Sequence, residues 1–350
     1  MNWNEIKLAY VPYHKELVVP GDRRRFIFYA SARKIPFEIA DSSKIYDIVY
    51  LTYGCDLSAW IKYKKINPNV KIIFELIDAY LLEDLGILTI FRGLVRYFHG
   101  KESSFWFYHK SALREIISFA DAVVCSNREQ MNNIININNN VHLSLDYFSN
   151  DISQHKVSLA SNKKLKLVWE GQAHTIKNLL LLNDIFEKLG DKVELYIVTD
   201  LVIKSPFKVF NRKTNSVLSK LKCQYHLIEW NICTFSYYIS NSDLAIIPIS
   251  SDNSMMWNKP ENKLLLFWEI GLPTLTSPTP SYKRVMDVAK LDFCCSSSDE
   301  WIRKIEEYME SSIEYRKEVM KKTNHYLNEY HTKNKILASW DSIFESLKWN

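Results

Sequence analysis

Two glutamates at a fixed spacing are the residues of this sequence best suited to do chemistry. Glu261 and Glu269 are separated by seven residues within the segment 258–273. Pro260 suits the first turn of a helix, and Gly271 suits the position just after a helix ends. On a helix that rises about 1.5 Å per residue, the two carboxylates lie roughly 12 Å apart along the axis and about 80° apart around it.

A span of this length matches a ligand with a sugar at each end and a diphosphate between them, such as a nucleotide sugar. The helix start between the glutamates would offer unpaired backbone N–H groups and a positive dipole end to the diphosphate. The alternative is an amphipathic helix with its apolar side chains in a core and both carboxylates in solvent. Strand-like runs on both sides, at 243–249 and 274–277, favour the binding site, because ligands of open α/β sheets bind where strands end.

The composition narrows the class of protein. A chain of 350 residues with 47% hydrophobic and 24% charged residues fits two folded globular domains. It has only 8 glycines, where average usage would give about 25, and it contains neither G-x-G-x-x-G nor G-x-x-x-x-G-K-[ST]. Rossmann dehydrogenases and P-loop enzymes are therefore disfavoured. The 6 cysteines include no C-x-x-C pair, which indicates buried thiols in a reducing compartment.

The sequence also predicts where the protein works. It has no signal segment and no apolar run long enough to span a membrane, so we expect a soluble, cytoplasmic protein. A net charge of +5 is too mild to indicate nucleic-acid binding. The stretch 88–117 mixes aromatic and basic residues, which could seat it on an anionic membrane surface. A core-facing helical hairpin whose long basic side chains reach solvent explains the same stretch equally well.

Strand-like runs alternate with helical patterns along both halves, which predicts two α/β domains with mainly parallel sheets. The predicted strands are 6–11, 47–52, 70–76, 121–125 and 141–145, then 164–169, 193–198, 224–228, 243–249 and 274–277. The predicted helices are 23–33, 56–66, 79–99, 105–119 and 127–136, then helices that begin at 177, 234 and 261 and a helical region from 298 onward. A polar stretch, 149–164, has the composition of a linker between domains 1–150 and 163–330.

Several of these segments together resemble retaining nucleotide-sugar glycosyltransferases of the GT-B fold, particularly glycosyltransferase family 4 and its relatives in bacterial surface-polysaccharide synthesis. The matching segments are 167–171 with Lys177, Trp230, 243–248 and 259–273, and in the first half 74–78 and 119–126. The resemblance implies two Rossmann-like domains that face each other across a cleft, with the C-terminal helix 331–350 packing back toward the N-terminal domain. It also implies a nucleotide-sugar donor, a saccharide or lipid-linked acceptor, and no cofactor.

The resemblance further implies roles for matching residues. Glu261 would bind hydroxyls of the donor sugar as a catalytic residue, and Glu269 would bind the ribose. Segment 230–233 would line the base pocket, although a strand end with one packed Trp is an alternative. Lys177 would neutralise the diphosphate, or it is a solvated residue at a helix start. The implied donor-binding residues of this half are Gly171, Lys177, Asn262, Lys263 and Glu269.

Two departures from the family pattern affect the expected site. Gln172 stands where family members often have a basic residue, and Ile77 stands near where many have a histidine. Asp78, at a cleft-facing strand end, would be the catalytic carboxylate of the N-terminal domain. If the chain were instead an inverting GT-B transferase, Asp78 or His14 could be the base. A GT-B-like partner protein without donor binding is the second alternative.

A loop after the first strand offers a replacement for the missing basic residue. Gly21, Asp22 and Arg23 provide a turn, a possible helix cap and the first of three consecutive guanidinium groups. Consecutive helix residues point about 100° apart, so at most two of the arginines 23–25 should face one ligand and the remaining one should be solvated. The alternative is Asp22 capping a solvated basic helix. No Asp-x-Asp motif occurs, so we expect no metal at the site.

Overall fold

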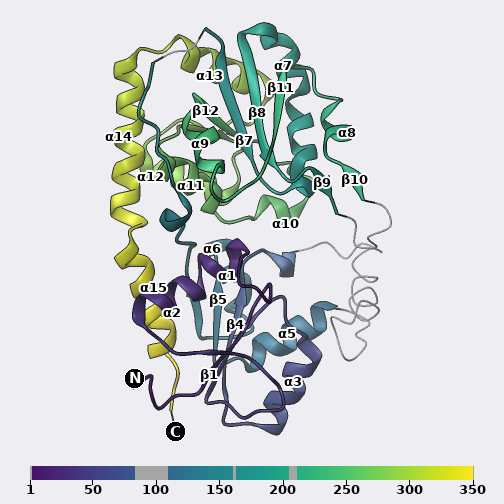
Figure 1. Ribbon diagram of the computed structural model, residues 1–350, viewed down its shortest axis with the longest axis vertical. Helices are drawn as coiled ribbons and strands as arrows, with labels where there is room; N and C mark the ends of the chain where they lie inside the picture. The colour runs from purple at the N-terminus through teal and green to yellow at the C-terminus, as the bar shows by residue number, and fades with distance from the viewer. Residues whose placement is uncertain (1, 83–108, 161–162, 205–210, 350) are drawn as a thin grey trace. The chain divides into compact units, whose positions relative to one another are not determined.

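The computed structural model describes residues 2–82, 109–160, 163–204 and 211–349, and every structural statement below concerns these residues. It divides into two compact units, each with its own parallel sheet (Figure 1). Unit 1 consists of Met1–Tyr147, Asn253–Pro260 and Lys333–Asn350. Unit 2 consists of Phe148–Asp252 and Glu261–Thr332. Two short parts of the C-terminal half, 253–260 and 333–350, thus belong to unit 1.

Unit 1 is built on a six-stranded parallel sheet with the order β2-β1-β3-β4-β5-β6. Four of its six strands are largely apolar and buried, as expected for a parallel sheet covered on both faces, and the two edge strands are more exposed. The order changes direction between β1 and β3, so the loops after these strands lie at a topological switch point. The strands are β1 (Leu8–Val11), β2 (Glu38–Ile39), β3 (Ile48–Thr52), β4 (Lys71–Leu76), β5 (Ala122–Cys125) and β6 (Val141–Leu143).

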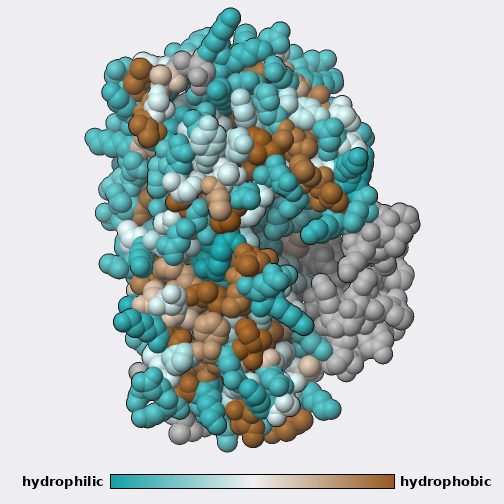
Figure 2. Space-filling view, in the orientation of Figure 1, coloured by the Kyte–Doolittle hydropathy of each residue, from teal (hydrophilic) through white to brown (hydrophobic). Residues whose placement is uncertain are grey.

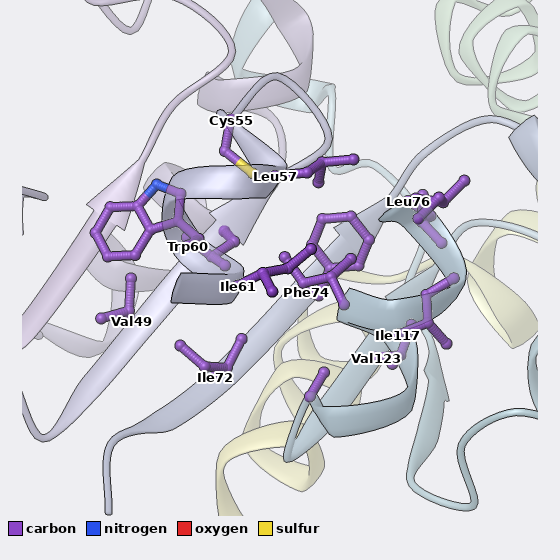
Figure 3. Close-up of a cluster of buried hydrophobic side chains, with 14 of the residues drawn as sticks. Val49, Cys55, Leu57, Trp60, Ile61, Ile72, Phe74, Leu76, Ile117 and Val123 are labelled. Atoms are coloured by element: carbon purple, nitrogen blue, oxygen red, sulfur yellow. The ribbon is translucent and has the colours of Figure 1, made fainter. Parts of the chain in front are cut away.

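Separate hydrophobic cores cover the two faces of this sheet. One core contains Trp60, Ile61 and Ile117 from helices against Phe74 of β4, as Figure 3 shows. The other contains side chains of α2 and α15, with Trp340 fully buried. The helices of unit 1 are α1 (Pro20–Arg23), α2 (Phe26–Arg33), α3 (Leu57–Ile66), η1 (Tyr80–Leu82), α5 (His109–Phe119), α6 (Arg128–Ile134), α10 (Ser254–Trp257) and α15 (Lys333–Glu345).

Unit 2 is built on a five-stranded parallel sheet with the order β11-β8-β7-β12-β13. In chain order this is the 3-2-1-4-5 arrangement of a doubly wound fold, whose switch point lies between β7 and β12. The strands are β7 (Leu165–Glu170), β8 (Val193–Thr199), β11 (Tyr225–Glu229), β12 (Leu244–Ile247) and β13 (Thr274–Thr276). A small antiparallel pair, β9 (Val202–Ile203) and β10 (Arg212–Lys213), lies outside this sheet.

Helix α11 carries the predicted glutamate pair. It runs from Asn262 to Ile270, and its C-cap Gly271 has φ 92°, a left-handed conformation that favours glycine. The predicted helix end is therefore confirmed. The other helices of unit 2 are η2 (Ser149–Asp151), η3 (Ala173–Leu182), α7 (Asn183–Leu189), η4 (Gly190–Lys192), α8 (Asn215–Leu218), α9 (Phe235–Ser240), α12 (Pro280–Ala289), α13 (Ser298–Glu310) and α14 (Ile313–Tyr330).

Most predicted elements are present, but three expectations need correction. Each predicted strand corresponds to an observed strand, while β2, the β9–β10 pair, η2, η4, α8, α10 and α12 were not predicted. The predicted helix 23–33 is interrupted, because Arg25 has φ −122° and ψ −112° between α1 and α2. The polar stretch 149–160 is no free linker, since its Lys156 N–H donates to the Ile270 carbonyl at 2.7 Å and its Nζ donates to the Ser242 carbonyl. The predicted helix 79–99 lies outside the described residues beyond η1.

Among the described residues, no helix is both long enough and apolar enough to cross a bilayer. On the face shown in Figure 2, hydrophobic residues lie in groups among hydrophilic ones. Of the aromatic–basic stretch 88–117, only 109–117 is described, and it forms part of α5 with Ala112, Leu113, Ile116 and Ile117 in the core. That part packs as core, and the remaining residues on which the membrane prediction rests lie outside the described part of the chain.

Candidate functional site

The switch point of the unit 2 sheet brings several predicted residues together. Strand β7 ends at Glu170, and Gly171 follows directly. The neighbouring strand β12 leads through α10 to Glu261 and the first turn of α11. Carboxyl ends of adjacent parallel strands at a switch point form the usual ligand site of such sheets. Glu170, Gly171, Glu261 and Lys263 are therefore the residues around which the candidate site is built.

Gly171 and Lys263 approach each other closely. The Gly171 N–H donates to the Val198 carbonyl at 3.2 Å, and its own carbonyl accepts from Thr199 Oγ1 at 2.6 Å, which fixes the turn against β8. A Cβ at position 171 would collide with Lys263 Nζ and lie 3.0 Å from the Trp169 ring. Only glycine allows this approach. This close contact explains why a glycine stands at position 171, opposite Lys263.

Lys263 is held by the end of β7. Its Nζ donates to the Glu170 carbonyl, lies 3.8 Å from Glu170 Oε2 and sits 5.1 Å from the centre of the Trp169 ring. The side chain keeps 27% exposure, so its charge is accessible to solvent. An ammonium group beside the N-terminus of α11 combines two features that attract phosphate, a cation and a helix dipole. Asn262, the first residue of α11, is half-buried beside it.

Glu261 lies directly before α11 and is nearly buried, with 6% exposure. Arg284 of α12 reaches its carboxylate, with Nη2 3.4 Å from Oε2 and 3.5 Å from Oε1. Burial raises the pKa of Tyr282, and the Glu261 and Glu170 carboxylates raise it further, which places both carboxylates near this ring. No motif in the sequence points to Arg284. Its only signal was a basic residue early in the helix after the next strand.

Glu269 lies in the last turn of α11. Its Oε1 accepts a hydrogen bond of 2.7 Å from Ser149 Oγ. The two glutamates therefore stand at opposite ends of one short helix, as the sequence predicted. Ser149 was not identified as part of the site, because a serine in a polar stretch carries no distinguishing signal.

Lys177 is placed differently from the expectation. It is exposed in the middle of η3, which begins at Ala173, so the predicted helix start at position 177 is wrong. The earlier start follows from a turn in which Thr175 N–H and Oγ1 both donate to the Gln172 carbonyl, each at 2.9 Å. Lys177 therefore does not stand at the positive end of a helix, where a nearby cation and the dipole would together attract an anion. Its contact with a diphosphate stays a prediction.

The predicted base-pocket segment begins with a packed tryptophan. The Trp230 N–H donates to the Thr199 carbonyl at 3.0 Å, and its ring stacks on Phe235 with centroids 5.7 Å apart. This arrangement matches the alternative of a strand end with one packed Trp. Binding of a base by 230–233 stays a prediction.

In unit 1, Asp22 is structural rather than a helix cap. It lies inside α1, whose N-cap is Val19, and it is fully buried. Its carboxylate accepts from Tyr10 Oη at 2.5 Å, Tyr13 N at 2.8 Å and His14 N at 3.0 Å. The capping prediction failed because these tertiary donors outcompete the local ones. The Asp22 carboxylate therefore holds the loop after β1. It is fully buried, so neither oxygen is exposed to a nucleotide sugar.

Gly21 and Arg23, on either side of Asp22, also make contacts within unit 1. A Cβ on Gly21 would lie 2.8 Å from the Tyr13 ring, so this glycine permits a close approach within unit 1. Arg23 is half-buried and donates to the Val18 carbonyl. Donor binding by Gly21 or Arg23 stays a prediction.

Arg25 contradicts the expectation of a solvated third arginine. It is fully buried, with Nε donating to Glu75 Oε1 at 2.6 Å and Nη1 donating to Asp146 Oδ1 at 2.9 Å. Burial raises the pKa of Glu75, and the Arg25 charge acts in the opposite direction. The three arginines straddle the junction of α1 and α2, so a single-helix geometry does not apply to them.

Asp78 follows β4 and pairs with the segment that precedes Glu261. Lys259 Nζ lies 3.8 Å from Asp78 Oδ1, and the Asp78 carbonyl accepts from the Gln130 side chain. The Asn127 side chain donates to the Asn258 carbonyl, which further holds this segment on unit 1. A catalytic role of Asp78 stays a prediction. Within the described ranges, no group of three His, Cys, Asp or Glu side chains could hold a metal ion together.

The sequence matches no protein-family model and no curated protein. Solved structures do match. HepE from Anabaena, in complex with UDP and glucose, has a TM-score of 0.63 at 12% identity, over 98% of this chain and 99% of HepE. A glycosyltransferase from Rickettsia africae ESF-5 has a TM-score of 0.60 at 12% identity, over 98% of each chain.

A variant of TarM from S. aureus, in complex with fondaparinux, alpha-GlcNAc-glycerol and UDP, has a TM-score of 0.55 at 10% identity. The match covers 85% of this chain and 55% of TarM, so this chain corresponds to about half of that protein. At these identities the similarity shows the fold. Two Rossmann-like sets of parallel strands, as in GT-B glycosyltransferases, confirm the predicted fold class.

Proposed function

We propose that the protein is a glycosyltransferase that takes a sugar from a nucleotide-diphosphate donor. The observation that carries the proposal is the cluster of Gly171, Lys263 and Glu261 at the switch point of the unit 2 sheet. A glycine turn, a cation beside a helix N-terminus and an adjacent carboxylate suit a diphosphate joined to a hydroxylated ring. Structures of the same fold with UDP bound support this choice.

The donor would lie along α11. The diphosphate would contact Lys263 and the first backbone N–H groups of the helix, with Asn262 beside it. The sugar hydroxyls would donate to Glu261, and the ribose hydroxyls would donate to Glu269. This placement uses the positive end of the helix for the group that gains negative charge when the glycosidic bond breaks.

The proposed reaction proceeds with retention and without a metal. The acceptor hydroxyl attacks the anomeric carbon from the face that the diphosphate leaves, so no protein nucleophile is required. Lys263 and the helix dipole stabilise the charge on the departing diphosphate. The proposed acceptor is a saccharide or a lipid-linked saccharide in the synthesis of a bacterial cell-surface polysaccharide, at the cytoplasmic membrane face. Transfer should persist in saturating EDTA, and loss of activity that magnesium or manganese restores would contradict the metal-free mechanism.

A donor screen tests the proposal directly. UDP-, GDP-, ADP- and dTDP-sugars are first compared for a rise in melting temperature, and any that binds is then incubated with water or a saccharide acceptor. NMR of the product anomer should show retention, and inversion would favour the alternative with a base such as Asp78. Binding of no nucleotide sugar would favour the inactive partner protein.

Two variants test the assigned residues. Glu269→Gln should weaken nucleotide binding by about 1–2 kcal/mol, the size of a charge-assisted hydrogen bond. Glu261→Gln should mainly reduce turnover, because its contact would strengthen as positive charge develops on the sugar. Full activity of both correctly folded variants would show that the donor lies elsewhere.

A further inference from the structure

The polar stretch that follows the first crossing between the units is fastened to unit 2 along its length. We call residues 148–160 the strap. At its start, Phe148 is fully buried and stacks on His331 with ring centroids 4.7 Å apart. In the middle, Ser153 Oγ lies 2.9 Å from Ser236 Oγ. Near its end, the Leu159 carbonyl accepts from Arg316 Nη1 at 3.2 Å.

The strap touches the last turn of α11 at two points. Lys156 N–H donates to the Ile270 carbonyl at 2.7 Å, and Ser149 Oγ donates to Glu269 Oε1 at 2.7 Å. Because the neighbouring anchors fix the strap independently of Glu269, the Ser149 hydroxyl is a fixed donor. The carboxylate is the longer and more adaptable group, so the bond orients Glu269 rather than Ser149.

Glu269 occupies a position where a carboxylate is otherwise unfavourable. The last turn of a helix carries the negative end of its dipole, which repels an anion. A hydroxyl that donates to one carboxylate oxygen offsets this repulsion and selects one rotamer. The second oxygen, Oε2, can then accept from a ligand hydroxyl while the side chain is already in its bound rotamer. Less conformational entropy is lost on binding, which improves affinity.

We infer that Ser149 is a positioning residue for the carboxylate that binds the ribose of the donor. The inference rests on the proposed function, since it assigns a partner to one of its binding residues. It makes Ser149, at the start of the strap, a part of the nucleotide site, although the polar composition of the strap resembles that of a connecting segment.

The test is nucleotide binding by variants of the full chain, with UDP and GDP as probes in calorimetry. Ser149→Ala should weaken the nucleotide that binds wild type about five- to tenfold, and Ser149→Thr, which keeps the hydroxyl, should restore most of the affinity. The matched control is Ser158→Ala, which removes an exposed hydroxyl of the same strap that accepts from the Ala160 N–H at 3.3 Å. This control should bind like wild type.

Analogues distinguish positioning from a general structural effect. The loss in Ser149→Ala should shrink when 2′-deoxy and 3′-deoxy nucleotides replace the probe, because the hydroxyls that Glu269 binds are then missing. Adding Ser149→Ala to Glu269→Gln should cause little further loss. Wild-type affinity in Ser149→Ala, together with weak binding by Glu269→Gln, would overturn the inference and leave the proposed function intact. If wild type binds no nucleotide or nucleotide sugar, both the proposed function and this inference are wrong.

Discussion

The carboxyl edges of the two parallel sheets use charged residues in opposite ways. In unit 2, Lys263 and Glu170 are 3.8 Å apart with partly exposed side chains, and Arg284 reaches Glu261 at 3.4 Å. In unit 1, Arg25 and Glu75 are 2.6 Å apart and fully buried. The first arrangement leaves charge accessible for a ligand, whereas the second pairs its charges with each other away from solvent.

The difference shows that similar topology does not imply similar use of the switch point. The unit 1 edge commits Arg25 and Asp22 to holding the loop after β1, through Glu75, Asp146 and Tyr10. Such a network fixes backbone positions, and any binding there depends on loop atoms rather than on these charges.

The largest effect should come from the buried network. Arg25→Met removes the partner of a buried carboxylate, and breaking such a pair costs about 3–5 kcal/mol. Urea unfolding should show this loss in the free energy of unfolding. The control is Arg23→Ala. Arg23 is half-buried, so its loss should change the free energy of unfolding by less than about 1 kcal/mol. Equal, small losses in both variants would mean that the buried Arg25–Glu75 pair contributes no more to folding than a half-buried arginine does.

Next in size should be loss of the unit 2 cation. Lys263→Met should lower kcat/KM about 10- to 100-fold, because a hydrogen bond to a charged group contributes about 1.5–3 kcal/mol. Its melting temperature should stay near that of wild type. Lys177→Met is the control from the exposed part of η3 and should lose much less. A larger loss in Lys177→Met would restore Lys177 as the main diphosphate ligand.

Gly171→Ala should lower kcat/KM as Lys263→Met does, although the charge of Lys263 is kept. The new Cβ would displace Lys263 Nζ, which is the end of a flexible side chain and can move without unfolding the protein. We expect about a tenfold loss of kcat/KM, because the ammonium would lose its place beside the helix start. Steady-state kinetics of Gly171→Ala combined with Lys263→Met should show no added loss, and full additivity would separate the two residues.

A smaller effect should follow from Arg284→Gln. Its contacts to Glu261 are long, at 3.4–3.5 Å, so kcat should fall only about three- to tenfold while donor KM changes little. Arg303→Gln removes an exposed pair with Glu307 and provides the matched control. If Arg284→Gln raised only KM, the guanidinium would contact the donor itself instead of positioning Glu261.

The smallest effect concerns pH. Burial lowers the pKa of His142, which contacts Asn140 Oδ1 at 2.8 Å and Ser346 Oγ at 3.0 Å in unit 1. The unfolded chain therefore takes up this proton first, at about pH 6.5, so stability present above that pH declines as pH falls toward the lowered folded pKa. Unfolding curves of His142→Gln should depend less on pH in this window. Nucleotide binding by the unit 2 residues should not follow the same profile.

The sequence predicted the elements but only some of the partners. Apolar strand runs and the Gly271 helix end are local signals, and the Gly171–Lys263 approach could be anticipated from two marked segments. Arg284 could not, because its contact with Glu261 depends on the packing of α12. Asp22 was assigned to a cap by a local rule that tertiary donors overrode. The strap was taken for a linker because its side chains are polar, although they bond to unit 2.

The position of α15 has a consequence for the order of folding. Its Trp340 is fully buried, and it stacks on Tyr29 with ring centroids 5.5 Å apart. Its Asp341 accepts from Tyr29 Oη across 312 positions of sequence. Contacts between such distant positions form late and slowly. During synthesis, α2 is therefore on this face of the first sheet without α15 while all of unit 2 is made, and the core around Tyr29 is completed when residues 333–347 emerge.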